Sequence, residues 1–387
     1  MATDRGDATQ HRGRRFPDDV PVLGDPAGRV LLRAHTEADL PAIVEQSNDP
    51  ASRHWTPLPI PEDGYGLREA RDFALGLIPA GWRNGTSYGW AIEAELDGPG
   101  ERRYAGTIDL GLAGDGTAEV GFSLHPAARG RGVMGTALRL VRDYGLDVAG
   151  LRAIRWRARV GNWPSRVVAA AAGFRFDGTV RSSLDFRGEL VDGWVATITA
   201  TDDRKPIRLP ETPVLDGDGV RLRPVDDADA DRLVGICTDP LTRRFLPRLP
   251  DPYTAADALR HAERLRETAA GGHGFGWCFG VPDEPAAAGT ITVRLEDSGR
   301  AEIGFSTHPD ARGRGLTTAA VRAVAGFLDA DPAVPSALIR CAASNPAARR
   351  VAERAGFALI GTQPASDLLG DGSLDDLLLF HRVCHTR

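Results

Sequence analysis

The sequence contains one motif twice, and this repeat constrains the fold more than any other feature. Residues 120–132 read VGFSLHPAARGRG and residues 303–315 read IGFSTHPDARGRG, so ten of thirteen positions are identical at an offset of 183. The same offset aligns Asn162 with Asn345. Because solenoid repeats have periods of about 20–50 residues, a period this long predicts two copies of a whole domain.

Length and composition agree with two domains. The 387 residues exceed a single typical core, and 42% apolar with 26% charged residues is typical of a globular protein. Prolines and glycines between Asp202 and Asp218 indicate a linker. We predict four segments: a disordered leader at 1–25, a first domain at 26–202, a linker at 203–216 and a second domain at 217–387.

Several functional classes are disfavoured by what the sequence lacks. No apolar run approaches the roughly 18 residues that span a bilayer, and the first 25 residues contain no apolar stretch typical of a secretory signal. The net charge of −6 offers no basic field for nucleic acid. The four cysteines lie in the second half without a CxxC pair, so no metal site or disulfide framework is indicated. We therefore expect a cytoplasmic protein without nucleic-acid, membrane or metal partners.

Both copies have the pattern of an α+β domain, in which helices flank a mixed, mostly antiparallel sheet. Apolar Ala137, Leu138 and Val141 recur at helical spacing after Gly132, whereas residues 154–160 alternate apolar residues with arginines, as a strand does. The other expected elements are helix starts at 36–39 and 226–229, helices at 67–77, 165–172 and 255–267, extended segments at 30–33 and 220–223, and strands at 88–95, 104–110, 118–124, 174–180 and 194–199.

A glycine-rich loop precedes the helix that follows Gly132. A helix N-terminus presents unpaired backbone N–H groups and a positive dipole end, so this loop predicts a phosphate site. Glycine lets the backbone approach a pyrophosphate without an obstructing Cβ. The spacing of Gly130, Gly132 and Gly135 also matches the dinucleotide-binding fingerprint. Two features argue against that match, because arginines replace the expected acidic residue in 154–160 and Thr318 replaces the third glycine in the second copy.

Both loops share the pattern Arg-x-x-Gly-x, at 129–133 and 312–316. This pattern resembles the Gln/Arg-x-x-Gly-x-Gly/Ala signature of the GNAT superfamily of N-acetyltransferases. Glu-Val-Gly-Phe before the loop, and Asn162-x-x-Ser165 and Gly173-Phe174 after it, are similar to the RimL/RimJ branch. The resemblance covers nearly the whole chain apart from the leader and the linker.

The resemblance implies that acetyl-CoA or another acyl-CoA binds where two strands splay apart, and that a neutral amine attacks the thioester directly. A backbone N–H near Leu124 would hold the oxyanion, a role typically worth about 2.7–4 kcal/mol. The first copy contains no cysteine, which disfavours an acyl-cysteine relay there. The residues expected to bind the cofactor are Phe122, Leu124, Arg129, Gly130, Arg131, Gly132, Val133, Met134, Gly135, Thr136, Asn162 and Ser165 in the first copy, and Thr307, Arg312, Gly313, Arg314, Gly315, Thr317 and Asn345 in the second. Among them, Met134 and Thr317 occupy a position that is usually small.

Two side chains are candidates for proton transfer. Glu119, with Glu302 as its counterpart, is predicted to accept the ammonium proton, and its alternative role is that of a solvated carboxylate. Ser165 is predicted to donate a hydrogen bond or proton to the departing thiolate, or to cap a helix. Because Ala348 replaces Ser165 in the second copy, we expect the first copy to be the catalyst and the second to bind the cofactor weakly or to build the substrate cleft.

The acceptor is less constrained. Trp55, in the segment Trp55-x-Pro57-Leu-Pro59, and Trp82 are candidate substrate-binding residues, with core packing as the alternative. The resemblance implies a peptide or protein N-terminus, or a small-molecule amine, as acceptor. Two alternatives stay open: an acyl donor carried on the phosphopantetheine of an acyl carrier protein, and a non-catalytic acyl-CoA sensor or scaffold. Fusion of two copies predicts a monomer that contains an intramolecular pseudo-dimer.

Overall fold

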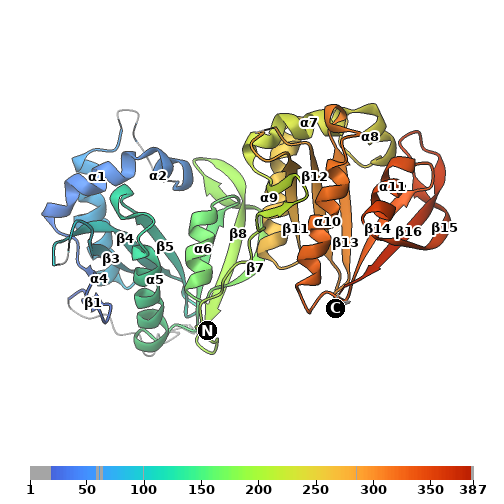
Figure 1. Ribbon diagram of the computed structural model, residues 1–387. Helices are drawn as coiled ribbons and strands as arrows, with labels where there is room; N and C mark the ends of the chain where they lie inside the picture. The colour runs from blue at the N-terminus through green and yellow to red at the C-terminus, as the bar shows by residue number, and fades with distance from the viewer. Residues whose placement is uncertain (1–18, 58–60, 62–63, 99, 285, 385–387) are drawn as a thin grey trace, which may run out of the picture. The chain divides into compact units, whose positions relative to one another are not determined.

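The computed structural model describes residues 19–57, 61, 64–98, 100–284 and 286–384. Within it the chain divides into two compact units, and the boundary along the chain lies between Arg208 and Leu209 (Figure 1). We refer to them as the first and second domain. Most of the predicted leader, and Leu58 and Pro59 of the Trp55 segment, lie outside the described residues.

The first domain is built on one eight-stranded sheet with the order β1-β2-β3-β4-β5-β6-β8-β7. The strands are β1 (Leu23–Gly24), β2 (Val30–Arg33), β3 (Ser87–Glu95), β4 (Arg102–Leu112), β5 (Thr117–Leu124), β6 (Ala153–Arg159), β7 (Arg175–Phe186) and β8 (Glu189–Thr199). Neighbouring strands are antiparallel except β5 and β6, which run parallel. Parallel neighbours need a crossover connection, and the helix between β5 and β6 supplies it. The predicted α+β class is confirmed.

Helices cover both faces of this sheet (Figure 1). They are α1 (Leu40–Asn48), α2 (Pro50–Trp55), α3 (Leu67–Arg71), α4 (Ile78–Asn84), α5 (Val133–Asp143) and α6 (Trp163–Ala171), with short 3-10 segments η1 (Glu37–Asp39) and η3 (Pro126–Ala128) and π segments η2 (Asp72–Leu77) and η4 (Tyr144–Val148). Side chains of a strand alternate between faces, so Trp90 and Ile92 pack in the large core with α5, whereas Ala91 packs in a smaller cluster with α1 and α3. The helix predicted at 67–77 continues to Asn84.

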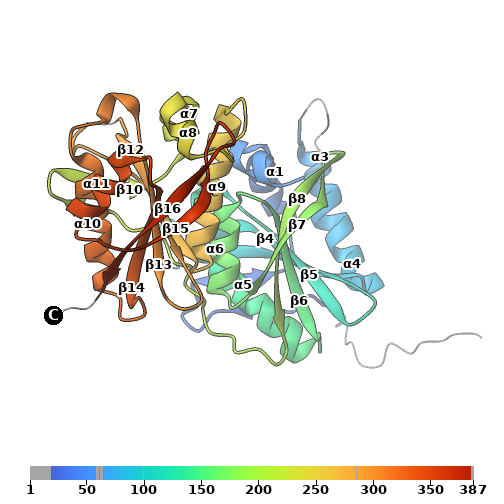
Figure 2. The same ribbon diagram turned by 90° about the vertical axis from the view of Figure 1, so that its right-hand side faces the viewer.

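The second domain repeats this plan, with the sheet order β15-β16-β14-β13-β12-β11-β10-β9 and the parallel pair β13 and β14. Its long terminal hairpin β15–β16 is red in Figure 2. The strands are β9 (Leu215–Gly217), β10 (Val220–Pro224), β11 (Gly274–Gly280), β12 (Gly289–Leu295), β13 (Ala301–Thr307), β14 (Ser336–Ala342), β15 (Ala358–Leu368) and β16 (Leu374–Val383). The helices are α7 (Ala230–Thr238), α8 (Pro240–Phe245), α9 (Ala255–Ala270), α10 (Leu316–Asp329) and α11 (Pro346–Arg354), with 3-10 segments η5 (Asp227–Asp229) and η6 (Pro309–Ala311).

The helix ends follow from local sequence. Asn162 caps α6 by accepting a hydrogen bond from the Ser165 N–H, and Gly173, at φ 89°, follows the helix in the left-handed conformation that a C-terminal glycine adopts easily. Thr254 and Asp257 form a capping box at the start of α9. Among the described residues, no helix combines the length and the apolar character that a bilayer crossing requires.

Candidate active site

The parallel strands of each sheet separate partway along their length. β5 pairs with β4 from Ala118 to Leu124, but with β6 only from Thr117 to Val120. From Gly121 onward, the side of β5 that faces β6 has no strand partner. We call this opening, between residues 121–124 of β5 and 157–159 of β6, the splay. The second domain has the same opening, since β13 pairs with β14 only from Ala301 to Ile303.

The backbone of β5 directs a hydrogen-bond donor into the splay. His125 N–H donates to the carbonyl of Ala105 at 2.8 Å, toward β4. Successive residues of a strand direct their N–H groups to opposite sides, so the Leu124 N–H points to the open side. In the second domain His308 N–H bonds Ala288 O at 2.8 Å, which turns the Thr307 N–H outward in the same way.

The glycine loop ends in a helix N-terminus that no side chain caps. Gly130 and Gly132 both have φ of 73°, and a Cβ on either would meet nothing within 4 Å. The loop therefore needs glycine for its left-handed backbone, and the space beside it is open. α5 has no side-chain cap, in contrast to α6, and no acidic residue lies in its first turn. Its first amides, from Val133 onward, are available to an anion.

The second loop has the same geometry, with Gly313 and Gly315 at φ of 76° and 80° and an uncapped α10. Met134 and Thr317, which stand where the family usually has a small residue, point away from the loops. Met134 is 5% exposed and packs in the first core. Thr317 Oγ1 lies 2.6 Å from Thr307 Oγ1 and ties α10 to the end of β13.

The loop arginines hold the loops to their own domains. Arg129 forms an ion pair with Asp49, the N-cap of α2, and donates to Ser52 Oγ at 2.9 Å. Arg312 pairs with Asp239, the N-cap of α8, in the same way. Arg131 donates to the Leu96 carbonyl at 2.6 Å, whereas Arg314 lies 3.8 Å from Glu284. These contacts indicate that Arg129 and Arg312, the first arginine of each motif, position the loops.

Asp109 was not identified from the sequence, and it lies at the start of the splay. It faces Gly121 across β4 and β5, where a Cβ would come within 2.9 Å of Asp109 Oδ1. Burial, together with the nearby charge of Glu119, raises the pKa of Asp109 to about 7. A carboxyl with a pKa near neutrality is suited to proton transfer. The available signal was an aspartate between two apolar residues, Ile108 and Leu110, near the middle of a predicted strand.

The predicted base Glu119 lies on the same face but is ion-paired. Its Oε2 is 2.6 Å from Arg157 Nη2 on β6. Glu302, its counterpart, is held more firmly, since Arg340 Nη2 approaches at 2.6 Å and Arg294 pairs with it as well. At the position of Asp109 the second domain has Thr292, which faces Gly304. Among the described residues, its splay therefore lacks an equivalent of the Asp109 carboxyl.

Ser165 lies in the first turn of α6, beside the core. Its Oγ accepts a hydrogen bond from the indole Nε1 of Trp156 at 2.9 Å, so its own hydrogen stays available for donation. The second domain replaces both partners with apolar residues, Ile339 for Trp156 and Ala348 for Ser165. Asn162 and Asn345, which are predicted to bind the cofactor, cap α6 and α11.

The two tryptophans occupy different environments. Trp82 is 5% exposed, stacks edge-on against Tyr88 and Trp90, and donates to Gly89 O at 2.9 Å. This burial gives it a core role, so we do not retain it as a substrate contact. Trp55 is half-buried at the end of α2, and the Arg159 guanidinium lies 5.4 Å from its ring centre.

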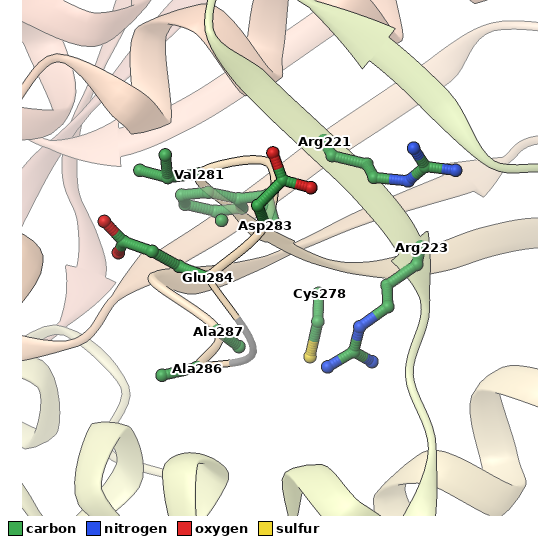
Figure 3. Close-up of a pocket in the computed structure, with 10 residues that line it drawn as sticks. Arg221, Arg223, Cys278, Val281, Asp283, Glu284, Ala286 and Ala287 are labelled. Atoms are coloured by element: carbon green, nitrogen blue, oxygen red, sulfur yellow. The ribbon is translucent and has the colours of Figure 1, made fainter.

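A small cavity of about 70 Å³ lies in the second domain at β10, β11 and the loop after β11. Figure 3 shows Cys278 beside Arg223 on this cavity, with Glu284 on the loop across from them. The cavity is smaller than the roughly 300–1,000 Å³ of typical ligand pockets. Burial and the neighbouring Asp229 raise the pKa of the Cys278 thiol, so it stays protonated and is a poor nucleophile.

A family model described as an acetyltransferase (GNAT) domain matches the chain twice, at residues 29–175 and 220–358. The probable N-acetyltransferase YjcK of Bacillus subtilis (strain 168) is 33% identical over 106 residues, which make up 27% of this chain. The match spans 59% of the length of that relative.

Solved structures of similar proteins include RimJ of Mycobacterium smegmatis in complex with CoA-disulfide. It is 27% identical, with a TM-score of 0.41, over 48% of this chain and 88% of its own. RimL in complex with coenzyme A is 17% identical, with a TM-score of 0.40, over 45% of this chain and 100% of its own.

Proposed function

The chain belongs to the GNAT acetyltransferase family, and we propose that its first domain moves an acyl group from acyl-CoA to an amine by direct attack. One observation carries the proposal. In a single sheet, the open side of β5 lies next to the uncapped, glycine-led N-terminus of α5. The open side of β5 supplies unpaired backbone groups for an extended pantetheine, and the N-terminus of α5 supplies amides for phosphates.

The residues of the loop fit a pyrophosphate. The amides of Val133, Met134 and Gly135 would hold the phosphates, and the open space beside Gly130 and Gly132 leaves room for them. Acyl-CoA supplies the activated thioester carbonyl. The Leu124 N–H, directed into the splay, would donate to the oxyanion that develops on that carbonyl.

Two side chains would move the protons. The Asp109 carboxylate, with a pKa near 7, would take the proton that the amine loses as its nitrogen bonds to the carbonyl carbon. The Ser165 hydroxyl, whose oxygen already accepts from Trp156, would donate to the departing sulfur. We assign Glu119 a secondary role, because its carboxylate is already ion-paired with Arg157.

We propose that the second domain keeps the phosphate loop but lacks the chemistry. Its loop and splay repeat those of the first domain. However, Thr292 and Ala348 replace the two proton-transferring groups, and two arginines neutralise Glu302. A cofactor bound there would raise the affinity of the chain for acyl-CoA or stabilise the structure of the domain, and it would not be turned over.

Calorimetric titration of acetyl-CoA into the full chain, with thiol release measured in parallel, tests the proposal. In Gly132→Glu, a β-carbon strains the left-handed backbone and a carboxylate repels phosphate. We expect its affinity for acetyl-CoA to fall at least about tenfold and its turnover to be lost. Gly315→Glu should remove only second-domain binding. Gly150→Glu, at a left-handed glycine with equally open surroundings, is the control for backbone strain.

The outcomes separate the alternative functions. Binding of acyl carrier protein without binding of CoA would show that the donor is an acyl carrier protein and not acyl-CoA. Binding of acetyl-CoA without thiol release, across a panel of peptide and small-molecule amines, would leave a sensor or scaffold. If Gly315→Glu abolishes turnover and Gly132→Glu does not, the assignment of the catalytic domain is reversed.

A further inference from the structure

A cationic side chain is stacked between two aromatic rings at the mouth of the first splay. Arg159, the last residue of β6, lies 5.4 Å from the ring centre of Trp55 and 5.0 Å from that of Phe186. Trp55 ends α2, and Phe186 lies at the tip of the β7–β8 hairpin. Residues from three segments that are distant in the sequence therefore meet around one guanidinium. We call Arg159, Trp55 and Phe186 the Arg159 cluster.

The cluster lies on the same face of the sheet as the proposed base. The parallel register places Glu119 opposite Arg155, and side chains two residues apart share a face. Arg159 is therefore on the face of Glu119, as is the Asp109 carboxyl, which contacts the position of Gly121. Arg159 and Asp109 therefore face the same side of the sheet, from which an acceptor amine would approach the proposed base.

The guanidinium of Arg159 has no acidic partner among the residues that the structure describes. Its one hydrogen bond there goes from Nη1 to the His54 carbonyl at 3.5 Å. The neighbouring Arg187 also uses backbone acceptors, including Thr56 O at 3.4 Å. The nearby Asp185 on the hairpin accepts instead from the Gly188 N–H at 2.8 Å. By contrast, Arg157, two residues earlier on the same face of β6, is paired with Glu119.

Stacking on aromatic rings orients a guanidinium while leaving its edge free for a carboxylate. Because the rings already restrict the side chain, little rotamer entropy is lost when an anion binds. The second domain has no such cluster, since the offset of 183 places Ala342 at Arg159 and Leu369 at Phe186. The cluster therefore occurs in the domain that has Asp109 and Ser165.

We propose that Arg159, held between Trp55 and Phe186, binds a carboxylate of the acceptor, so that the first domain prefers amines at the ends of acidic peptides. This inference rests on the proposed function. The fork of one guanidinium matches the two oxygens of one carboxylate.

The test compares acceptor peptides of equal length that differ only in the second residue, Glu in one and Gln in the other. With the full chain and saturating acetyl-CoA, we expect kcat/KM by thiol release to favour the Glu peptide by about tenfold. A peptide with phosphoserine at that position distinguishes a carboxylate site from a general anion site. A phosphoserine peptide preferred over the Glu peptide would overturn the carboxylate assignment.

Variants test whether Arg159 causes the preference for the Glu peptide. Arg159→Gln should bring the ratio of kcat/KM for the Glu and Gln peptides close to one. Arg159→Glu should reverse the charge preference, so that a peptide with Lys at the second position is acetylated faster than the Glu peptide. Arg181→Gln, at an exposed arginine of β7 outside the cluster, should keep the wild-type ratio. An unchanged ratio in both Arg159 variants would overturn the inference and leave the proposed function intact. Failure of every amine to release thiol, with acetyl-CoA bound, would overturn both.

Discussion

The two domains share the fold around the glycine loop and differ in the polar side chains near it. Both have the same strand order, the same parallel pair that separates partway, and the same left-handed glycine before an uncapped helix. Yet Thr292 stands in place of Asp109, and Ala348 in place of Ser165. The glycine loop therefore recurs in a domain that has neither carboxyl nor hydroxyl at these two positions, and the loop alone does not distinguish the two domains.

The differences are matched by changes in their neighbours. Trp156 needs a partner for its buried indole and has Ser165, whereas Ile339 needs none and lies in the domain with Ala348. An unsatisfied buried donor costs about 1–3 kcal/mol, so the two positions are coupled. The second domain thus lacks both polar groups, and no buried donor is left unpaired at these two positions.

The largest effect that separates the domains is expected at Asp109. Asp109→Asn removes the proposed proton acceptor and should lower kcat by about 10²- to 10⁴-fold. The matched variant Thr292→Ala in the second domain should leave kcat unchanged. In the unmodified protein, kcat/KM should rise with pH through about 7, because Asp109 must be ionised to act as a base. A thiol-release assay across pH 5–9 measures both effects; equal loss in the two variants would contradict the comparison.

Stability provides a second, independent measurement at the same residue. The pKa of Asp109 is raised in the fold to about 7, so the folded state binds the proton more tightly than the unfolded state does. Its contribution to the free energy of unfolding must therefore fall as pH rises from about 4 to 7 and then level off. At about 1.4 kcal/mol per pKa unit, Asp109→Asn should be stabilising by up to roughly 4 kcal/mol at pH 8 and by little at pH 4.

Urea unfolding of the full chain at both pH values measures this difference, with the first-domain transition followed separately where two transitions occur. Asp97→Asn, at a carboxylate with 57% side-chain exposure, is the control and should have little effect at either pH. A stabilisation by Asp109→Asn that is equal at pH 4 and pH 8 would show that the raised pKa is not its cause.

The smallest effect is expected at Ser165, where a structural and a chemical role overlap. Ser165→Ala should lower turnover by about tenfold and stability by about 1–3 kcal/mol, because the Trp156 indole loses its acceptor. In a Trp156→Phe background the stability loss should disappear while the turnover loss persists. Chemical unfolding and single-turnover rates of the four proteins separate the roles. If the turnover loss also disappears in the Phe background, Ser165 acts only as the partner of Trp156.

Sequence reasoning reached those features that depend on local pattern. The repeat predicted two copies of one domain, the alternation in 154–160 predicted β6, and the glycine loop predicted the start of α5, as the structure confirms. Such features depend on backbone conformation and on side-chain periodicity within one segment. The contrast between Ser165 and Ala348 was likewise readable, because the repeat aligns the two positions.

Only the tertiary structure distinguished Trp82 from Trp55 and brought Asp109 to the splay. Trp82 and Trp55 are the same residue type, but one packs inside the core and the other lies beneath a guanidinium. Asp109 has a pKa near neutrality because the packing of β4 between β3 and β5 buries its carboxyl and places Glu119 nearby. Solvation and stacking depend on how separate strands and helices pack together, so no pattern within one segment encodes them.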